Sequence, residues 1–319
     1  MNKLSIVLPA KNEEVGLSKV LPRLISLYPN AEIILVDDGS SDGTEKLVKE
    51  FKQATYVRHP VSIGNGGAIK SGARTASGDV IVFMDADGQH DPSEISLLLE
   101  RIDEGYDLVV GARDRKSQAN ARRAIANALF NKLATAMTGF VVKDLTSGFR
   151  AVRREKFLTI LYLLPNKFSY PTTSTMAFFR NGFFVDYVPI NVVAREGKSH
   201  IKIFRDGIRF LLIIIKIGAL FSPMRFFLPI SLLLFSFATV FYLYTYLSAG
   251  RFTNMGMLLY LSSLTTFLIG IVSEQVSALH YKDTSRAPRV NFQANDENLT
   301  EQLHHLEPLD STDPMRKVS

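Results

Sequence analysis

Runs of apolar residues alternate with amphipathic segments over the N-terminal part of the chain. The runs predict strands at residues 4–8, 31–36, 55–58, 80–84 and 107–110, of which 55–58 is the weakest. Between them, apolar residues spaced three or four apart predict helices, most clearly at Leu17, Val20, Leu21, Leu24 and Leu27. Regular alternation of strand and helix predicts an α/β fold with a doubly wound, mostly parallel sheet.

The most informative stretch of the chain runs from Asp79 to Asp91. Its apolar run is unbroken, which predicts a strand buried on both faces, and it stops at a cluster of carboxylates. Ligands of open α/β sheets lie in the crevice beyond the carboxyl ends of the strands, so we expect Asp85, Asp87 and Gln89 to line that crevice. Hard oxygen ligands at alternate positions suit Mg²⁺ or Mn²⁺, which clamp substrate phosphates. We interpret this loop as a metal-dependent site for a nucleotide diphosphate.

Two other interpretations apply to the same acidic loop. An Asp-x-Asp pair at a strand end is often a solvated loop that only caps the next helix. A calcium loop of the EF-hand type that begins at Asp85 is excluded, because His90 stands where glycine is needed and Ser96 where the bidentate glutamate belongs.

A second candidate loop is the glycine-rich segment 64–70. It is not the dinucleotide fingerprint, because Ile69 stands where the third glycine would be, and no phosphate-loop Gly-Lys-Ser/Thr follows. The simpler interpretation is a flexible turn at a helix N-terminus. The more specific interpretation is a loop that lets Lys70 reach a phosphate.

Charge and cysteine content narrow the possible functions. The chain has no cysteine, which excludes disulfides, thiolate nucleophiles and cysteine-ligated zinc. The net charge is +6, and the cations gather next to the most hydrophobic segment, so we expect a membrane surface as partner and no nucleic acid. No apolar signal region stands at the N-terminus, so we expect the first domain on the cytoplasmic side.

Two uncharged apolar runs, Phe226–Gly250 and Phe252–Ser273, stand near the C-terminal end of the sequence. Each is long enough to cross roughly 30 Å of hydrocarbon at about 1.5 Å per residue. Arg251 stands alone between the runs, whereas several cations flank their outer ends. The positive-inside rule therefore predicts an integral membrane protein with a hairpin at 226–249 and 253–273 and both ends in the cytoplasm.

A cationic stripe precedes this hairpin. Lys202, Arg205, Arg209 and Lys216 fall on one side of a helical wheel whose remaining surface is almost wholly apolar. We predict an amphipathic helix in the membrane interface, and the alternative is a buried helix with snorkelling cations. We predict four parts of the chain: a catalytic α/β domain at residues 1–200, an interfacial helix at 201–222, a transmembrane hairpin at 223–276 and a disordered cytoplasmic tail at 277–319.

Five motifs in a fixed order add a family resemblance. They are Leu-Pro-Ala-Lys-Asn-Glu-Glu, Val-Asp-Asp-Gly-Ser-Ser-Asp-Gly-Thr, Asp-Ala-Asp-Gly-Gln, Leu-Thr-Ser-Gly-Phe-Arg and Arg-Glu-Gly-Lys-Ser. In this order they resemble the family-2 glycosyltransferases of the dolichol-phosphate mannose synthase type, from about residue 4 to residue 221. The resemblance implies a GT-A catalytic domain, a nucleotide sugar donor and a polyprenyl phosphate acceptor.

The resemblance also implies roles for individual residues. The nucleoside would be held by Pro9, Ala10, Asn12, Glu14, Asp37 and Asp38. The metal-binding motif corresponds to Asp85, Asp87 and Gln89. The acceptor phosphate would be held by Arg113 and Arg123, with Asn127 standing where a serine is common. A segment that closes over the site corresponds to Arg195, Ser199 and Lys202.

The implied reaction is transfer of a hexose, with inversion, to polyprenyl phosphate. A phosphate monoester has a second pKa near ~6, so at neutral pH it needs orientation more than deprotonation. Asp144 is either a general base or a residue that orients Arg123 or a loop, and we favour the structural role. GDP-mannose is the favoured donor and UDP-glucose the alternative, since both use the same carboxylate chemistry.

Three other functions are compatible with parts of the sequence. A processive polysaccharide synthase shares the sheet and the Asp-x-Asp pair, but such synthases resemble one another in a Gln-x-x-Arg-Trp motif and this chain has no tryptophan. A catalytically silent nucleotide-binding membrane adaptor is disfavoured by the intact set of carboxylates and arginines. A dehydrogenase is disfavoured by the missing glycine fingerprint.

Overall fold

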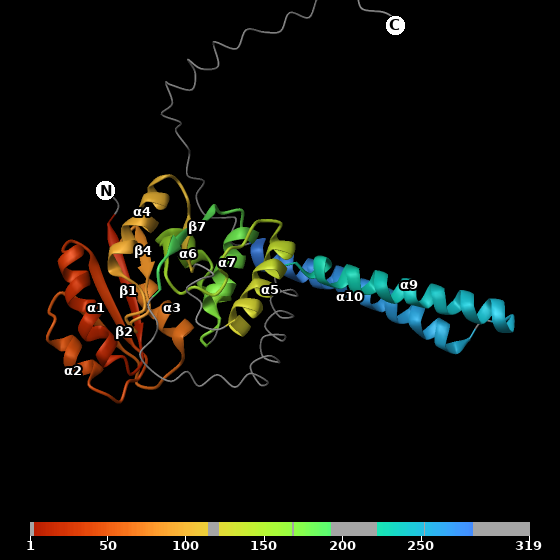
Figure 1. Cartoon of the computed structure of the whole chain (residues 1–319), viewed down its shortest axis with the longest axis horizontal. Coiled ribbons are helices and arrows are strands. Elements are labelled where there is room, and N and C mark those ends of the chain that lie inside the picture. Colours follow the sequence, from red (N-terminus) through yellow and green to blue (C-terminus); the bar gives the residue numbers. More distant parts are fainter. Residues whose placement is uncertain (1–2, 114–120, 168, 193–221, 252, 283–319) are drawn as a thin grey trace, which may run out of the picture. The chain divides into compact units, whose positions relative to one another are not determined.

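The computed structural model describes residues 3–113, 121–167, 169–192, 222–251 and 253–282 (Figure 1). The predicted interfacial helix at 201–221, the closing segment with Arg195, Ser199 and Lys202, and the polar tail beyond residue 282 lie outside these residues. The described residues all belong to one compact unit of the chain.

Strands and helices alternate along most of the described chain. The strands are β1 (Leu4–Ala10), β2 (Glu32–Asp37), β3 (Ala54–Arg58), β4 (Val80–Phe83), β5 (Leu108–Arg113), β6 (Arg150–Arg153) and β7 (Val185–Ile190). The α-helices are α1 (Glu14–Leu27), α2 (Thr44–Lys49), α3 (Asn65–Thr75), α4 (Ile95–Asp103), α5 (Ala121–Thr138), α6 (Arg154–Thr159), α7 (Tyr170–Arg180), α9 (Pro223–Ala249) and α10 (Asn254–Lys282). Two short 3₁₀ helices are η1 (Pro92–Glu94) and η3 (Leu161–Leu163).

The strands form one sheet in the order β3-β2-β1-β4-β6-β5-β7. All neighbouring pairs are parallel except those of β6, which runs antiparallel to both β4 and β5. The chain winds from β1 outward to β3 and then returns to place β4 on the other side of β1. This reversal of winding is where open α/β sheets bind ligands, beyond the carboxyl ends of the strands. The predicted doubly wound, mostly parallel sheet is confirmed.

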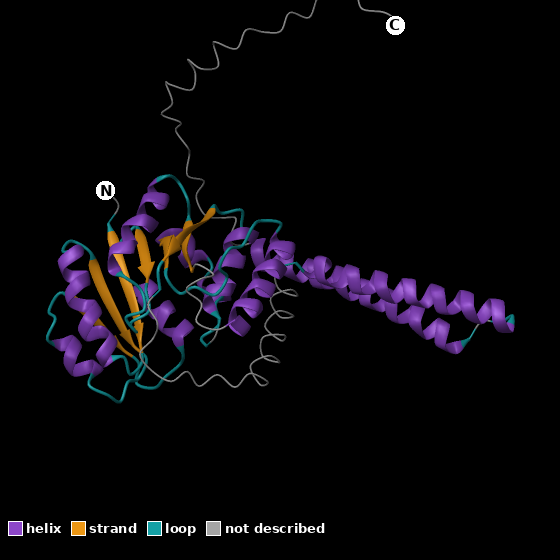
Figure 2. Cartoon of the chain, viewed as in Figure 1, coloured by secondary structure: helices purple, strands orange, loops and turns teal. Residues whose placement is uncertain are grey.

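Helices cover both faces of the sheet, as Figure 2 shows. Side chains that alternate along β1 explain this arrangement, because successive residues of a strand point to opposite faces. Ile6 and Leu8 are buried in the core cluster that contains the α1 and α4 stripes. Val7 is buried in the other cluster, with residues of α3 and α7. The alternating apolar residues of β1 therefore contribute to both cores.

The stripe predicted for the first helix is confirmed in α1 except at Leu27, the last residue of the helix, which is 45% exposed. Leu17, Val20, Leu21 and Leu24 are buried there, which fixes the helix against the sheet. Gly16, in its first turn, packs on the loop after β4, where an added Cβ would come within 2.3 Å of the carbonyl oxygen of Ala86. The helix therefore holds the acidic loop in place through direct backbone contact.

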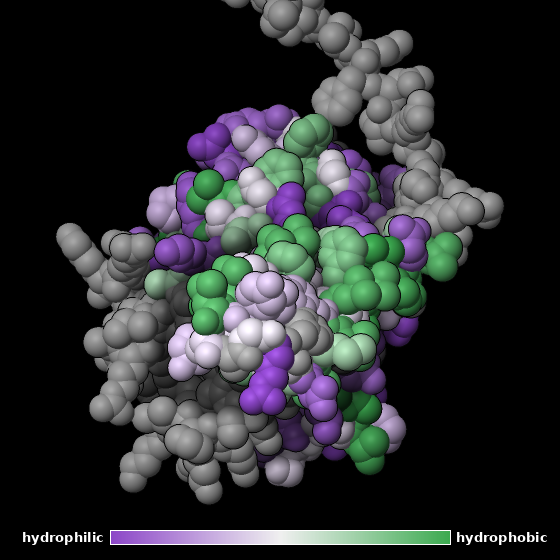
Figure 3. Space-filling view, turned by 90° about the vertical axis from the view of Figure 1, so that its right-hand side faces the viewer, coloured by the Kyte–Doolittle hydropathy of each residue, from purple (hydrophilic) through white to green (hydrophobic). Residues whose placement is uncertain are grey.

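The hairpin helices α9 and α10 pack side by side. Ser231 and Ser263 join them, since each hydroxyl donates to the carbonyl oxygen of the other residue at 3.0 and 2.9 Å. The segments Pro223–Ser248 and Asn254–Leu279 are long and apolar enough to cross a membrane. Most of their side chains are not buried within the protein, and Figure 3, which views the molecule from the side at the right of Figure 1, shows hydrophobic side chains gathered on that face.

Candidate active site

A cavity of about 450 Å³ opens at the carboxyl ends of β1, β2 and β4. Five of its lining residues are among those predicted from the sequence: Pro9, Ala10, Asp38, Asp85 and Asp87. The loop before α3 contributes Ser62 and Gly64, and the first residue of α3, Asn65, also lines the cavity. The parallel register brings these segments together, because Ala10 pairs with Asp37 and the neighbouring strand β4 ends beside β1. Carboxylates from two separate sequence motifs therefore face one space.

The acidic loop after β4 is held between two close backbone neighbours. Asp85, Asp87 and Gln89 are half-buried, and the Asp87 carboxylate accepts the backbone N–H of Gln89 at 3.1 Å. On one side lies α1. On the other lies Gly148, where an added Cβ would come 2.7 Å from Oδ2 of Asp85. Any side chain at residue 148 would displace this carboxylate, so the glycine of the Thr-Ser-Gly-Phe motif has a steric role.

The chemistry of this loop fits a divalent cation that a substrate helps to bind. Among the described residues no cluster of three or more His, Cys, Asp or Glu side chains could hold a metal ion by itself. Mg²⁺ binds proteins through one or two carboxylates, and substrate phosphates and waters complete its octahedral shell. Asp85 and Asp87 supply the carboxylates, and a diphosphate in the cavity would supply further oxygen ligands.

The Asp38 carboxylate of the cavity accepts several hydrogen bonds. It accepts the Ser62 hydroxyl at 2.6 Å and the backbone N–H groups of Ile63 and Gly64 at 2.9 and 2.8 Å, and Nδ1 of His59 lies at 2.8 Å. Burial alone would raise the pKa of Asp38, but these hydrogen bonds hold it below its ordinary value. The carboxylate is therefore ionised and fixed in orientation.

The residues Asn12 and Glu14 do not line the cavity but join its two loops. Asn12, with a φ of 57°, accepts the backbone N–H of Ser41 through its side chain and donates its own N–H to Ser40. The carboxylate of Glu14 accepts the backbone N–H of Gly43 at 3.1 Å. In the structure both residues fix the loop after β1 to the loop after β2.

Asp37 and Lys70 also lie outside the cavity lining. Asp37 is fully buried and accepts the backbone N–H of Ser40 at 2.7 Å and the Tyr56 hydroxyl at 2.6 Å. The ammonium group of Lys70 donates to the carbonyl oxygen of Leu164 at 3.0 Å, and burial lowers its pKa. These contacts orient the side chains toward the protein framework, so the structure does not bring Lys70 together with Asp85 and Asp87.

Arg113, at the end of β5, forms a two-point ion pair with Asp144. Its Nε donates to Oδ2 at 2.8 Å and its Nη2 to Oδ1 at 3.0 Å. Burial would raise the pKa of Asp144, but the guanidinium and the backbone N–H of Thr146 hold it below its ordinary value. The sequence analysis linked Asp144 to Arg123 or a loop, whereas the structure pairs it with Arg113. Arg123 and Asn127 belong to α5, and their side chains are not among those the structure describes.

Two buried residues beside the site were not predicted. His90 stacks on Phe149 with ring centroids 5.0 Å apart, and its Nδ1 has no hydrogen-bond partner in the described part of the chain. Burial lowers the pKa of His90 to about 4, helped by Arg113 and opposed by Asp87, so the imidazole is neutral. Only its position next to the acidic motif could have indicated a role.

Arg150 is the other unpredicted residue, although it closes a motif that the resemblance used. It is fully buried, donates to the carbonyl oxygens of Ser147 and Pro171 and to the Ser174 hydroxyl, and lies over the ring of Tyr170. In the described residues no carboxylate lies within ion-pair distance of it. This guanidinium fixes the backbone of the loop that carries Asp144 to its neighbours.

Comparison with known proteins gives two family matches. The model of glycosyl transferase family 2 matches residues 5–161, and the model of the GtrB C-terminal hairpin matches residues 222–279. The second match covers most of α9 and α10. The resemblance drawn from the motifs is therefore confirmed, and the second match shows that the two apolar runs form a hairpin of a known type.

Two curated relatives carry names related to polyprenyl phosphates. Polyprenol monophosphomannose synthase from Mycolicibacterium smegmatis is 34% identical over 205 residues, which are 60% of this chain and 77% of that protein. Undecaprenyl-phosphate 4-deoxy-4-formamido-L-arabinose transferase from Proteus mirabilis is 38% identical over 164 residues, 48% of this chain. The chain spans half the length of the second relative.

Solved structures share the fold of the catalytic domain. Glucosyl-3-phosphoglycerate synthase from Mycobacterium tuberculosis, in complex with Mn²⁺ and UDP-glucose, is 28% identical with a TM-score of 0.52, over 67% of this chain and 79% of that one. The same enzyme was also solved with Mg²⁺ and UDP, at 26% identity, a TM-score of 0.53 and the same coverage of both chains. Together, the matched models, the sheet and the mannose synthase relative show that this chain belongs to glycosyl transferase family 2.

Proposed function

We propose that this protein transfers a hexose from a nucleotide sugar to a polyprenyl phosphate in the membrane. The observation that carries the proposal is one cavity at the switch point of the sheet, lined by Asp38, Asp85 and Asp87, in a chain with two helices apolar enough to span a bilayer. Carboxylates suit a metal-bound diphosphate, and a hairpin suits an acceptor that never leaves the membrane. The curated relatives, named for polyprenyl phosphate substrates, support the same acceptor class.

On the donor side, the side chains would bind and orient a nucleoside diphosphate sugar. The Asp38 carboxylate already accepts hydrogen bonds from Ser62, Ile63 and Gly64, so it would fix the loop that meets the nucleoside, next to Pro9 and Ala10. Asp85, Asp87 and Gln89 would hold Mg²⁺ or Mn²⁺, which supplies charge neutralisation for the departing diphosphate. Structures of the glucosyl-3-phosphoglycerate synthase with these ions and UDP support this assignment.

On the acceptor side, Arg113 would hold the lipid phosphate. Asp144 takes Nε and Nη2 of Arg113, and Nη1 has no hydrogen-bond partner among the described residues, so it is available to a phosphate oxygen. That oxygen forms a bond to the anomeric carbon from the face opposite the diphosphate, and the bond from this carbon to the diphosphate oxygen breaks. Inversion and release of the nucleoside diphosphate follow. Arg123 and Asn127 are proposed as further phosphate ligands, and Arg195, Ser199 and Lys202 as the closing segment.

GDP-mannose is the proposed donor. The mannose synthase relative matches over three quarters of its length, which supports mannose. UDP-glucose is the second candidate, because the solved neighbour at 28% identity binds UDP-glucose. Thermal shifts with each nucleotide sugar and Mg²⁺ or Mn²⁺ distinguish them, since a ligand that binds only the native state raises its melting temperature.

The test of the proposed function is the variant Asp87→Ala. We expect sugar transfer to polyprenyl phosphate to fall by at least about a hundredfold, the size of effect that follows loss of electrostatic stabilisation of a leaving group. The matched control is Asp79→Ala, an exposed aspartate at the opposite end of the same strand, which should keep full activity. Full activity of Asp87→Ala, or of the native protein in excess chelator, would refute the metal assignment. Absence of any transfer by the native protein would favour the non-catalytic adaptor.

A further inference from the structure

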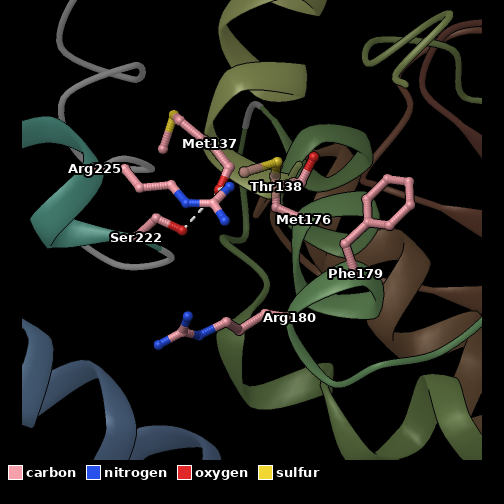
Figure 4. Close-up of a pocket in the computed structure, with 7 residues that line it drawn as sticks. All are labelled: Met137, Thr138, Met176, Phe179, Arg180, Ser222 and Arg225. Carbon is pink, nitrogen blue, oxygen red and sulfur yellow. Dashed lines mark hydrogen bonds between the residues drawn. The ribbon is translucent and has the colours of Figure 1, made fainter. Parts of the chain in front are cut away.

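A second pocket, of about 170 Å³, lies where α5, α7 and the start of α9 meet (Figure 4). Two guanidinium groups line it, Arg180 from α7 and Arg225 from α9, together with the hydroxyl of Ser222. Met137 and Phe179 give part of the wall an apolar character. None of these residues belongs to the cavity that contains Asp85 and Asp87.

Arg225 is a cation without an acidic partner in the described part of the chain. Its Nη1 donates to the carbonyl oxygens of Met137 and Ala136, at 2.9 and 3.2 Å. These carbonyls belong to the last turn of α5, where backbone acceptors lack intrahelical donors. Nη2 and Nε have no hydrogen-bond partner among the described residues. One side of the guanidinium is therefore anchored, and the other retains donors for a ligand.

Arg180 adds a second guanidinium group to the pocket. Its Nη2 lies 2.8 Å from the Glu274 carboxylate of α10, and both side chains are about one-third exposed. In Figure 4 the Arg225 side chain extends from α9 toward Met137, and the Arg180 side chain extends from α7 in the opposite direction, toward the hairpin. Among the described residues, the two guanidiniums that line the pocket have one carboxylate beside them, that of Glu274. A partly solvated cationic pocket of this kind favours an anion.

The pocket lies at the level expected for lipid headgroups. α9 has 27 residues, about 40 Å at ~1.5 Å per residue, which exceeds the roughly 30 Å of hydrocarbon by more than one turn. The first turn, with Arg225, can therefore remain in the headgroup region. Glu274 of α10 lies at the same level, because its carboxylate accepts the backbone N–H of Met224 at 3.3 Å.

The pocket is also separate from the proposed acceptor site. Arg123 stands near the beginning of α5 and Met137 at its end. Fourteen helical positions correspond to about 21 Å along the helix axis. One phosphate cannot contact both ends of this helix, so an anion in the pocket would be a second ligand.

We propose that this pocket binds the phosphate group of an anionic membrane phospholipid. Arg225 and Arg180 would donate charge-assisted hydrogen bonds to the phosphate oxygens. Met137 and Phe179 would contact the glycerol and the first methylene groups. The bound lipid would connect α7 of the catalytic domain to the base of the hairpin. The proposal goes beyond the sugar transfer and does not depend on it.

The test uses the full chain in detergent, titrated with phosphatidylglycerol or with zwitterionic phosphatidylcholine. We expect phosphatidylglycerol to raise the melting temperature by several degrees and phosphatidylcholine to have little effect. In Arg225→Gln the apparent affinity for phosphatidylglycerol should fall at least about tenfold, as expected for loss of a hydrogen bond to a charged group. The matched control is Arg251→Gln, which removes the same charge at the far end of the hairpin and should behave like the native protein.

Four results would overturn this proposal. The first is an equal phosphatidylglycerol effect in Arg225→Gln and the native protein. The second is an equal effect of phosphatidylcholine. The third is an equal effect of glycerol 3-phosphate alone, which would show a site for a soluble phosphate. Because Arg225→Gln also loses its bonds to α5, Arg180→Gln is measured beside it, with bound lipid counted by native mass spectrometry. Unchanged lipid occupancy in Arg180→Gln would also contradict the proposal.

Discussion

The ion pair between Arg113 and Asp144 indicates whether Asp144 is a general base or a residue that positions Arg113. A general base needs a pKa near the working pH, and Asp144 is held below its ordinary value of about 3.9 by its partners. It is therefore a poor base at neutral pH. Its two-point contact instead fixes the guanidinium plane, with one nitrogen left for a phosphate. The geometry therefore favours a role for Asp144 in positioning Arg113.

We predict that Asp144→Asn raises KM for polyprenyl phosphate by about tenfold or more, since the amide keeps the shape of the side chain but not the ionic contact. Because the folded pKa is depressed, the stability that the pair contributes is present above about pH 4 and is lost only as pH falls through the lower folded value. The pH–rate profiles of the native and variant enzymes should therefore have the same shape between about pH 6 and 9.

A steep fall in kcat with KM unchanged, and recovery of the rate at high pH, would instead identify Asp144 as the base. The matched control is Asp79→Asn, which makes the same chemical change at an exposed position at the opposite end of the sheet. It should leave both parameters unchanged. Comparison of the two variants separates the local ion pair from a general effect of removing a negative charge.

The sequence predicted which side chains lie together where a motif stands at the end of a strand. Asp38, Asp85 and Asp87 meet because each directly follows a strand of the predicted sheet. The partners of Asn12 and Glu14 come from the loop after β2, about 30 residues away, and only the folded register brings them together. Side-chain pairing between loops depends on tertiary structure, so apolar spacing carries no information about it.

At the scale of elements, the position of α1 depends on the absence of a side chain at Gly16. Helix propensity alone would make Gly16→Ala raise the free energy of unfolding, by at most about 1 kcal/mol. The added methyl group would lie 2.3 Å from the carbonyl oxygen of Ala86, the residue between Asp85 and Asp87. Backbone cannot move away as a flexible side chain can, so we predict net destabilisation by about 1–3 kcal/mol, with weaker nucleotide binding.

Thermal unfolding and nucleotide titration measure this effect. Ser18→Ala, on the exposed face of the same helix, is the control in which propensity acts without a clash. The two variants should change stability in opposite directions. A Gly16→Ala variant as stable as the native protein, with normal nucleotide affinity, would mean that α1 does not hold the acidic loop.

The sequence predicted those helices and strands whose buried positions are occupied by apolar residues. β1, β2, β4 and α1 are of this kind. In α7 the buried positions include Thr172, Thr173, Ser174 and Thr175, and β6 begins with the fully buried Arg150. Buried polar residues break the hydrophobic pattern, so α7, β6 and the antiparallel pairing gave no sequence signal. The short strand β6 depends on pairing with β4 and β5, which is a tertiary feature.

At the scale of the whole molecule, the proposed reaction requires the catalytic domain and both ends of the hairpin on one side of the membrane. α9 and α10 run as two adjacent helices with a short connection at Gly250 and Arg251, so both outer ends return to the same side. Arg225 at the start of α9 and the cations after α10 favour the cytoplasmic side by the positive-inside rule. This orientation is a proposal, and the chain is well suited to testing it.

Because the native chain contains no cysteine, a single introduced thiol reports its own location without background. We predict that a membrane-impermeant maleimide added to intact cells labels Arg251→Cys at the hairpin turn. The same reagent should label Gln53→Cys, an exposed position before β3, only after the membrane is permeabilised. The two variants control for each other, because both sites are exposed in the folded protein. Labelling of Gln53→Cys and protection of Arg251→Cys in intact cells would place the nucleotide site outside, where a cytoplasmic nucleotide sugar cannot reach it, and the proposed reaction would have no donor.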